Sequence, residues 1–434
     1  MDYNQLLIND SIIRSISIFD SNKKLQVLKN ELHSNGYIDE LFQEYDLDFF
    51  KNSYYAEFRD FVFSNSSKDS INTLRKDFNE VFLFHKKGIQ IKLNYCKIFL
   101  FPEGLHFFLL DFTPIGNTLN VISDTTFCIQ KLELNNLISN EEQPTIEWIK
   151  WIESNCLKGN KILSTKEKHV SVDDYSGSKF KLFTVIDLEK QVSHEERLHL
   201  LYDIGCNARI GSAAGNDENS PSHYYFKELT NNKVSVFKNY DILPLFDSFT
   251  VIGNHILSPE IWKRSTWETT YFRIILYNLF IKYNLFKFNK EVKEDSIQTR
   301  NKFESFVNKY NFSHISFNFL PNLLFKNHRK ALEIDSELSL FQERINRINQ
   351  EIQERQQSRM NTLISIVTVL SSLSSISPIY DIVDTFRVKH DWSNTLFYGV
   401  LSIPFFIIAF VLVRFIFPDQ TKILLTKIKK TIKN

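Results

Sequence analysis

Two groups of polar residues in this chain have types and spacings that suit chemistry. The first is a glycine-rich segment, residues 205–217, which holds three of the 11 glycines. Glycines at this density let backbone N–H groups approach an anion, and Asn, Ser and Arg side chains suit nucleotide recognition. The segment predicts a ligand-contacting loop, with a mobile surface loop as the alternative. The predicted ligand contacts are Asn207, Arg209, Gly211, Ser212, Gly215 and Asn216.

The second group is a stripe of hydroxyl side chains within an uncharged segment, residues 360–380. Its members recur every three or four residues, which places them on one side of a helix. Several copies of such a helix around a common axis would line a water-filled pore. The alternative is that small polar residues let membrane helices pack closely. The predicted pore-lining residues are Thr362, Ser365, Thr368, Ser372 and Ser375.

Patterns that would support catalysis or metal binding are missing from the sequence. His194 and His199 lie five residues apart, where a zinc-binding helix needs four, so they should point to separate sides of a helix. Asp173 and Asp174 fit a solvated loop. The glycine-rich segment has neither GxGxxG nor Walker spacing, and no nucleophile elbow or zinc quartet occurs. The sequence therefore predicts no catalytic residue, no metal ligand and no enzyme.

Composition narrows the remaining classes of function and location. Lys and Arg number 52 against 51 acidic residues, so no overall field favours nucleic acid, and direct nucleic-acid binding is not predicted. The four cysteines are widely separated without CxxC spacing and predict reduced, mostly buried thiols. Residues 1–18 lack a basic start followed by an apolar core, so a cleaved signal peptide is not expected.

The chain before residue 258 has the pattern of a folded α/β domain. Residues 1–75 are mixed and polar, with amphipathic stretches such as residues 39–63 that predict helix. Pro102 and Gly104 separate two β-rich runs and predict a hairpin. The predicted strands are residues 81–84, 89–101, 105–112, 181–188, 234–237 and 249–252. Further helices are predicted after residue 144 and over residues 193–203, 259–280 and 295–310.

The helix that begins at about Pro259 is unusually aromatic. Ser258 supplies its N-cap, and proline suits its first position. The helix carries Arg273 and Lys282, so it should pack against protein rather than cross lipid.

A stalk helix is predicted beyond residue 321. Its apolar residues alternate at intervals of three and four, which predicts a seam for a partner helix, and Glu343 with Arg347 supports an exposed face. No Gly or Pro interrupts residues 322–377, so a single unbroken helix of about 80 Å is expected to continue into the membrane. The seam residues are Ala331, Ile334, Leu338, Phe341, Ile345, Ile348 and Ile352.

Two membrane spans are predicted, because residues 360–380 carry no charge and a second uncharged run covers residues 392–413. Basic residues precede the first run and follow the second, while the loop between them holds only Arg387 and Lys389. This asymmetry predicts that both termini are cytoplasmic.

These patterns give the following expected organisation. It comprises a cytoplasmic α/β ligand-sensing domain (1–257), a helical neck (258–320), a stalk coiled-coil helix (321–359), transmembrane helix 1 (360–380), an outer loop (381–391), transmembrane helix 2 (392–417) and a basic cytoplasmic tail (418–434).

This order of elements resembles the CorA-like family of two-transmembrane-helix divalent-cation channels over residues 259–434. The resemblance implies an α+β cytoplasmic domain followed by a long stalk helix and two transmembrane helices. It also implies a homo-oligomer, in that family a pentamer, whose first span lines the pore in the lipid bilayer. The family's Gly-Met-Asn motif is missing, since residues 377–381 read Ser-Pro-Ile-Tyr-Asp.

Residues 97–108, residues 245–251 and the helix around Tyr271 are similar to a divergent branch of that family that lacks the motif. That branch accompanies type III CRISPR antiviral systems as a membrane effector. The resemblance implies that the cytoplasmic domain binds a small nucleotide second messenger, an AMP conjugate of S-adenosylmethionine, and that the membrane part opens in the bacterial inner membrane. No other cofactor is expected.

Two other functions fit parts of the same pattern. A divalent-cation channel would need metal-binding carboxylates between neighbouring cytoplasmic domains. A membrane-anchored interaction scaffold would use the two spans only as a tether.

Overall fold

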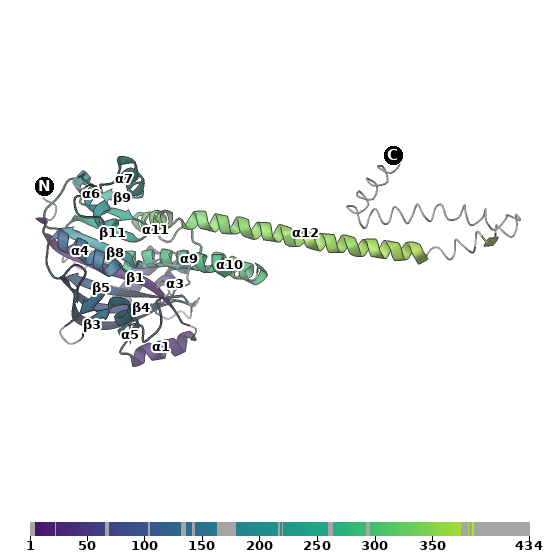
Figure 1. Ribbon diagram of the computed structural model, residues 1–434, viewed down its shortest axis with the longest axis horizontal. Helices are drawn as coiled ribbons and strands as arrows, with labels where there is room; N and C mark the ends of the chain where they lie inside the picture. The colour runs from purple at the N-terminus through teal and green to yellow at the C-terminus, as the bar shows by residue number, and fades with distance from the viewer. Residues whose placement is uncertain are drawn as a thin grey trace, which may run out of the picture. The chain divides into compact units, whose positions relative to one another are not determined.

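The computed structural model describes most of the chain up to residue 374. The described residues are 5–374 without 22, 66–68, 103–104, 132–135, 141–143, 163–178, 216–217, 219, 259–263 and 292–295, together with 381, 384 and 385. The chain divides into two compact units, Met1–Phe341 and Gln342–Asn434. The first unit holds the sheet and the helices that cover it (Figure 1).

An 11-stranded mixed sheet forms the centre of the first unit. Its strands are β1 (Ile8–Asp20), β2 (Ile38–Asp39), β3 (Asn72–Phe84), β4 (Ile89–Leu100), β5 (Leu105–Pro114), β6 (Leu137–Ser139), β7 (Ile146–Glu147), β8 (Lys181–Leu188), β9 (Val234–Phe237), β10 (Tyr240–Pro244) and β11 (Ser248–Asn254). Their order is β7-β6-β3-β4-β5-β1-β8-β11-β10-β9, with β2 paired to β3. The pairing of β8 with β11 is parallel, and the other described pairings are antiparallel.

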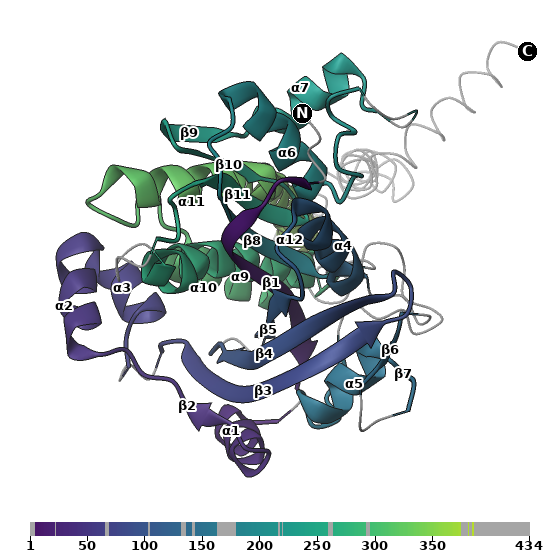
Figure 2. The same cartoon turned by 90° about the vertical axis from the view of Figure 1, so that its left-hand side faces the viewer.

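Helices α1 to α7 lie between strands along the chain, and the remaining helices follow the last strand. They are α1 (Leu25–Ser34), α2 (Glu44–Ser53), α3 (Ala56–Val62), α4 (Leu119–Gln130), α5 (Trp148–Asn155), α6 (His194–Gly205), α7 (His223–Thr230), η2 (Thr266–Tyr271), α9 (Phe272–Glu291), α10 (Ser296–Tyr310), α11 (Phe319–Ala331) and α12 (Ile334–Ser374). Figure 2 shows the long, curved strands β3 and β4, with α1 and α5 beside them. The prediction of an α+β domain is confirmed.

The predicted strands are confirmed, and so is the hairpin near Pro102, because β4 and β5 pair antiparallel on either side of it. Strand β1 was missed, although it lies between β5 and β8 near the middle of the sheet. Its polar residues Arg14, Ser15 and Ser17 are all buried. A strand that is covered on both faces was expected to be apolar throughout. The buried polar residues interrupt the apolar run, so the strand was not predicted. Strands β2, β6, β7 and β10 were also missed.

Each face of the sheet packs against its own helices. On one face Trp148 and Trp151 of α5 contact Phe82 and Phe84 of β3, and α4 and α6 contribute to the same apolar cluster. On the other face α9 packs its aromatic side chains against the strands. Pairs on this second face are Phe99 with Phe272, Phe101 with Phe280, Phe107 with Tyr283 and Phe183 with Phe272.

The aromatic helix predicted from Pro259 packs against protein, as expected. Its predicted first residues, 259–263, lie outside the described residues. Its described part contains a π-helical turn, η2, that leads directly into α9. Arg273 and Lys282, which argued against a membrane span, are 5% and 3% exposed.

The prediction of one unbroken helix over residues 322–377 is wrong. Helix α11 ends at Ala331, and α12 begins at Ile334. Glu333 between them has φ of 55°, in the left-handed region that interrupts a right-handed helix. Sequence inspection for Gly and Pro missed this break, because the chain adopts the left-handed conformation at a glutamate.

Helix α12 is 41 residues long and carries the predicted seam residues from Ile334 onward. Leu338, Ile348 and Ile352 are half-buried, and pairing of the seam with a partner helix stays a prediction. Ile334, Phe341 and Ile345 are buried, whereas Glu343 and Arg347 form the expected ion pair at 2.8 Å on the exposed face. In the described part of the chain, no helix combines the length and hydropathy that a membrane crossing needs. Residues 375–380 of the first predicted span and the whole second span, residues 392–417, lie outside the described residues.

Candidate functional site

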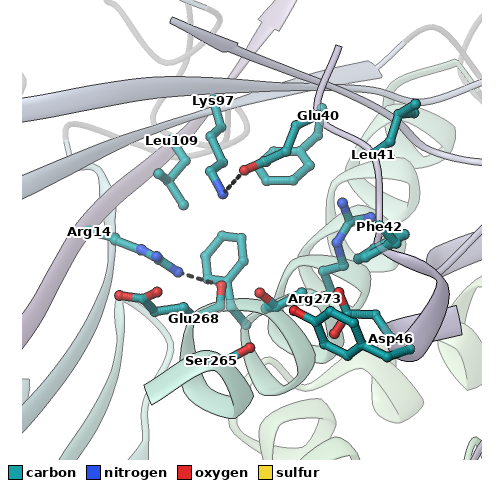
Figure 3. A pocket seen from close by; sticks show the side chains of 14 residues that line it. Arg14, Glu40, Leu41, Phe42, Asp46, Lys97, Leu109, Ser265, Glu268 and Arg273 are labelled. Carbon is teal, nitrogen blue, oxygen red and sulfur yellow. Dashed lines mark hydrogen bonds and ion pairs between the residues drawn. The ribbon is translucent and has the colours of Figure 1, made fainter. Parts of the chain in front are cut away.

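A charged cavity of about 220 Å³ lies between the sheet and the η2–α9 segment (Figure 3). Strands β1, β4 and β5 contribute one wall, η2 and α9 a second, and the chain from β2 into α2 a third. The cavity is lined by Arg14, Glu40, Leu41, Phe42, Tyr45, Asp46, Lys97, Phe99, Leu109, Ser265, Glu268, Thr269, Phe272 and Arg273.

Strand register brings Arg14 and Lys97 to the same face of the sheet. Arg14 on β1 pairs with Asp111 on β5, which in turn pairs with Tyr95 on β4. Residues opposite each other in paired strands share a face, and so do residues two apart along one strand. Lys97, two residues after Tyr95, therefore lies on this face, and Figure 3 shows both cationic side chains pointing into the cavity.

Arg14 is held rigidly by three protein acceptors. Its Nε donates to Asp111 at 2.8 Å, its Nη2 donates to the Tyr95 hydroxyl at 2.8 Å, and its Nη1 donates to the carbonyl oxygen of Glu268 at 2.7 Å. The Tyr95 hydroxyl donates to the same carboxylate of Asp111 at 2.8 Å. A buried guanidinium needs such partners, because an unpaired buried charge is strongly disfavoured. Arg14 thus fixes the position of η2 relative to β1.

Lys97 is less constrained. Its ammonium group is 2.7 Å from Glu40 Oε1, and Glu40 is its one ion-pair partner among the described residues. Burial lowers the pKa of Lys97, and the charge of Glu40 opposes that effect. An ammonium group has three donors, so Lys97 retains hydrogen-bonding capacity toward an anion in the cavity.

Arg273 approaches the cavity from α9. Its Nη1 and Nη2 donate at 2.7 Å to Val62 O and Thr73 Oγ1. Its guanidinium lies 4.4 Å from the ring centre of Phe42, a cation–π contact. It also lies 5.6 Å from the ring centre of Phe99, so rings of the protein already contact this guanidinium. The aromatic side chains of the cavity lining are the groups that suit stacking of a planar ligand group.

Carboxylates among the lining residues balance these cations. Glu268 accepts from Arg264 at 2.8 Å through Oε1, and Asp46 accepts from the backbone N–H of Gln43 at the start of α2. Burial raises the pKa of Asp46, and the backbone hydrogen bond opposes that effect. The cavity therefore offers positive and negative groups to one ligand.

This combination favours a small ligand that carries both signs of charge and a planar group. The volume of about 220 Å³ is below the ~300–1,000 Å³ typical of pockets for whole drug-sized ligands. The cavity fits a nucleoside- or amino-acid-sized part of a larger molecule.

The glycine-rich segment contacts a carboxyl group of the protein itself. The carboxylate of Asp203 accepts from the backbone N–H groups of Gly211 at 2.7 Å and Ala213 at 2.9 Å. Two of the N–H groups expected to approach an anion therefore already donate to a side chain of the protein itself.

The other predicted ligand contacts occupy varied positions. Asn207 has φ of 54° and its side chain donates to Gln130. Ser212 is buried, Gly215 has φ of 82°, and Asn216 lies outside the described residues. Arg209 is exposed. None of the described members lines the charged cavity, and their role in ligand binding stays a prediction.

The hydroxyl stripe is partly described. The hydroxyls of Thr362 and Thr368 donate back to the carbonyl oxygens of Ser358 and Ile364, as threonine often does in helices. Ser365 is buried within this single chain. The side chain of Ser372 and the whole of Ser375 lie outside the described residues.

The structure places the two histidines of the HEERLH segment in different surroundings. His194 Nδ1 is 3.0 Å from Asp241, whereas the His199 ring contacts Phe226, so the two histidines serve separate contacts. No cluster of three or more metal-ligating side chains occurs in the part of the chain that the structure describes. Asp173 and Asp174 lie outside it.

The sequence did not lead us to predict a site at the residues of the charged cavity. One signal was available: Arg14 stands within the isoleucine-rich run of residues 12–18, where a charge needs a specific partner. Comparison of the chain with known protein families, with curated proteins and with solved structures finds no match.

Proposed function

We propose that this protein is a ligand-gated membrane effector whose first unit binds a small charged nucleotide in the cavity between β1, β4 and η2. The observation that carries the proposal is the juxtaposition of Arg14, Lys97 and Arg273 with Glu268 and Asp46 in one partly enclosed cavity. The membrane part of the proposal rests on the two uncharged runs of the sequence, and the antiviral setting rests on the resemblance to CorA-like effectors.

The proposed ligand is the AMP conjugate of S-adenosylmethionine. It carries a phosphate, planar adenine groups and an amino-acid group, so it has the charges and flat surfaces that the cavity complements. Only part of this molecule fits the cavity volume, and the rest would extend past Tyr45, a lining residue that is 66% exposed. A ligand opens a pore only if it binds the open state more tightly than the closed state.

Lys97 is the side chain that most directly tests this assignment, because Arg14 and Arg273 also organise the fold. Replacing Lys97 with Met removes one charge-assisted hydrogen bond and keeps most of the side-chain volume. We expect the dissociation constant for the conjugate to rise by about 10- to 100-fold. Calorimetric titration of the full-length protein in detergent measures this change.

Lys92→Met is the matched control, because Lys92 is on the same strand and does not line the cavity. It should bind the conjugate as the unmodified protein does. In liposomes that contain the unmodified protein, the conjugate should release a trapped ion. The Lys97→Met variant should need a correspondingly higher concentration of the conjugate for the same release. Leakage that ignores the conjugate would refute gating, and equal affinities of the two variants would refute the cavity assignment.

A further inference from the structure

A continuous helical segment leads from the charged cavity to the base of the stalk helix. It consists of the π-helical turn η2 and the following helix α9. At its start, Glu268, Thr269, Phe272 and Arg273 line the cavity. A π-helical turn inside a longer helix contains an extra residue and is frequent at functional sites. The ligand end of this segment is therefore its least regular part.

The far part of α9 contacts both α11 and α12. Asn278 Nδ2 donates to the carbonyl oxygen of Phe325 in α11 at 3.0 Å. One helical turn further, Lys282 Nζ is 2.5 Å from Glu337 Oε1 in the first turn of α12. Helix α9 is thus bonded to the chain on both sides of Glu333, where the left-handed residue separates the two helices.

The Lys282–Glu337 ion pair is largely shielded from water. Lys282 is 3% exposed, and its ammonium lies 4.8 Å and 5.2 Å from the ring centres of Phe286 and Phe246. A shielded ammonium depends on its carboxylate partner, so the pair strongly restricts the position of α12 relative to α9. Exposed ion pairs, such as the Glu343–Arg347 pair further along α12, impose no comparable restriction.

We propose that η2 and α9 couple the cavity to α12, and that the Lys282–Glu337 ion pair is the contact through which they act. The inference rests on the proposed function, because it assigns a route for regulation by the ligand of that cavity. A ligand that contacts Glu268 shifts the π-helical turn, α9 moves with it, and α12 reorients at Glu333. Coupling between two sites is reciprocal, so loosening the α12 end must also loosen the cavity end.

Glu337→Gln tests this coupling without any ligand. The variant keeps the shape of the side chain and an acceptor for Lys282 but removes the charge. In the full-length protein in detergent, hydrogen exchange of the η2 amides should become at least about 5-fold faster. Glu343→Gln is the matched control, because it removes a carboxylate of α12 that pairs with Arg347 of the same helix. This variant should leave η2 exchange unchanged.

Lys282→Met supplies a second variant, because it removes the shielded ammonium itself and leaves Glu337 partly accessible to water. In liposomes, both coupling variants should bind the conjugate yet reduce the conjugate-dependent leakage at least about 10-fold. Unchanged η2 exchange in both variants, or a full leakage response in both, would overturn the coupling. The exchange experiment needs no ligand, so failure of the unmodified protein to leak would refute the proposed function separately.

Discussion

At the scale of single residues, buried charges that bond to backbone or to partners organise this protein. Asp203 is an example outside the cavity. It is fully buried at the end of α6, and it accepts hydrogen bonds from Gly211 and Ala213. Burial raises its pKa to about 7, although those two hydrogen bonds lower it. The carboxylate thus joins the glycine-rich segment to α6.

The shifted pKa of Asp203 predicts a pH-dependent stability. In the unfolded chain an aspartate titrates near ~3.9, so between about pH 4 and about pH 7 the folded state binds the proton more tightly. The contribution of Asp203 to the free energy of unfolding should therefore fall as pH rises through this window, by at most about 4 kcal/mol, and stay constant above it.

Urea unfolding of the unmodified protein and of Asp203→Asn, at a series of pH values from 4 to 8, measures this effect. Asparagine does not titrate, so the difference in free energy of unfolding between the two proteins isolates Asp203. That difference should decline with rising pH up to about 7. A difference that stays constant over the whole range would contradict the raised pKa.

At the scale of secondary-structure elements, the break between α11 and α12 distinguishes this chain from the single stalk helix that its sequence predicts. Arg329 near the end of α11 pairs with Asp335 in the first turn of α12, so the two helices are bonded across the break. Phe341 of α12 lies 4.2 Å from Phe303 of α10, measured between ring centres. Part of the apolar seam therefore packs against α10 of the same chain rather than against a partner helix.

The left-handed conformation of Glu333 gives a prediction for stability. Glycine adopts this conformation freely, whereas a β-branched residue resists it. Glu333→Gly should leave the free energy of unfolding unchanged or raise it by up to about 1 kcal/mol, and Glu333→Ile should lower it by about 1–2 kcal/mol.

Urea unfolding of the full-length protein measures both variants of Glu333. Glu343→Ile is the control, because it places the same residue on the exposed face of α12 in ordinary helical conformation, where the expected cost is under about 0.5 kcal/mol. If Glu333→Ile proves as stable as Glu333→Gly, the break between the helices is not fixed by a left-handed residue.

At the scale of the whole molecule, a pore and a tether make different demands on the hydroxyl stripe. A pore needs polar groups along its axis, whereas a scaffold anchored by two spans does not. Replacing both Ser372 and Ser375 with Leu should therefore suppress conjugate-dependent leakage from liposomes if the stripe lines a pore. Binding of the conjugate to the first unit should stay unchanged.

Ile366→Leu is the control for this experiment, since Ile366 belongs to the opposite side of the predicted helix and the change keeps its apolar character. Leakage that persists in the double leucine variant would favour close helix packing as the role of the stripe. Rescue of a magnesium-transport-deficient strain by the unmodified protein would instead favour the divalent-cation channel.

Helices and strands with a clear local residue pattern could be predicted from the sequence. The β-rich runs predicted β4, β5 and β8, and residues 193–203 predicted the helix that the structure shows as α6. The three-and-four spacing predicted a seam on α12, of which Ile334, Phe341 and Ile345 are buried. Such patterns are carried by residues close together in the chain, because the periods of strand and helix place them on one face.

The charged cavity and the contacts that link it to α12 depend on tertiary packing and could not be predicted from the sequence. Arg14, Lys97 and Glu268 are far apart in the sequence and meet because of strand register and the packing of η2 on the sheet. The Lys282–Glu337 ion pair likewise depends on the turn at Glu333 that carries α12 past α9. Such contacts join residues that are far apart in the chain, so they leave no periodic pattern in the sequence.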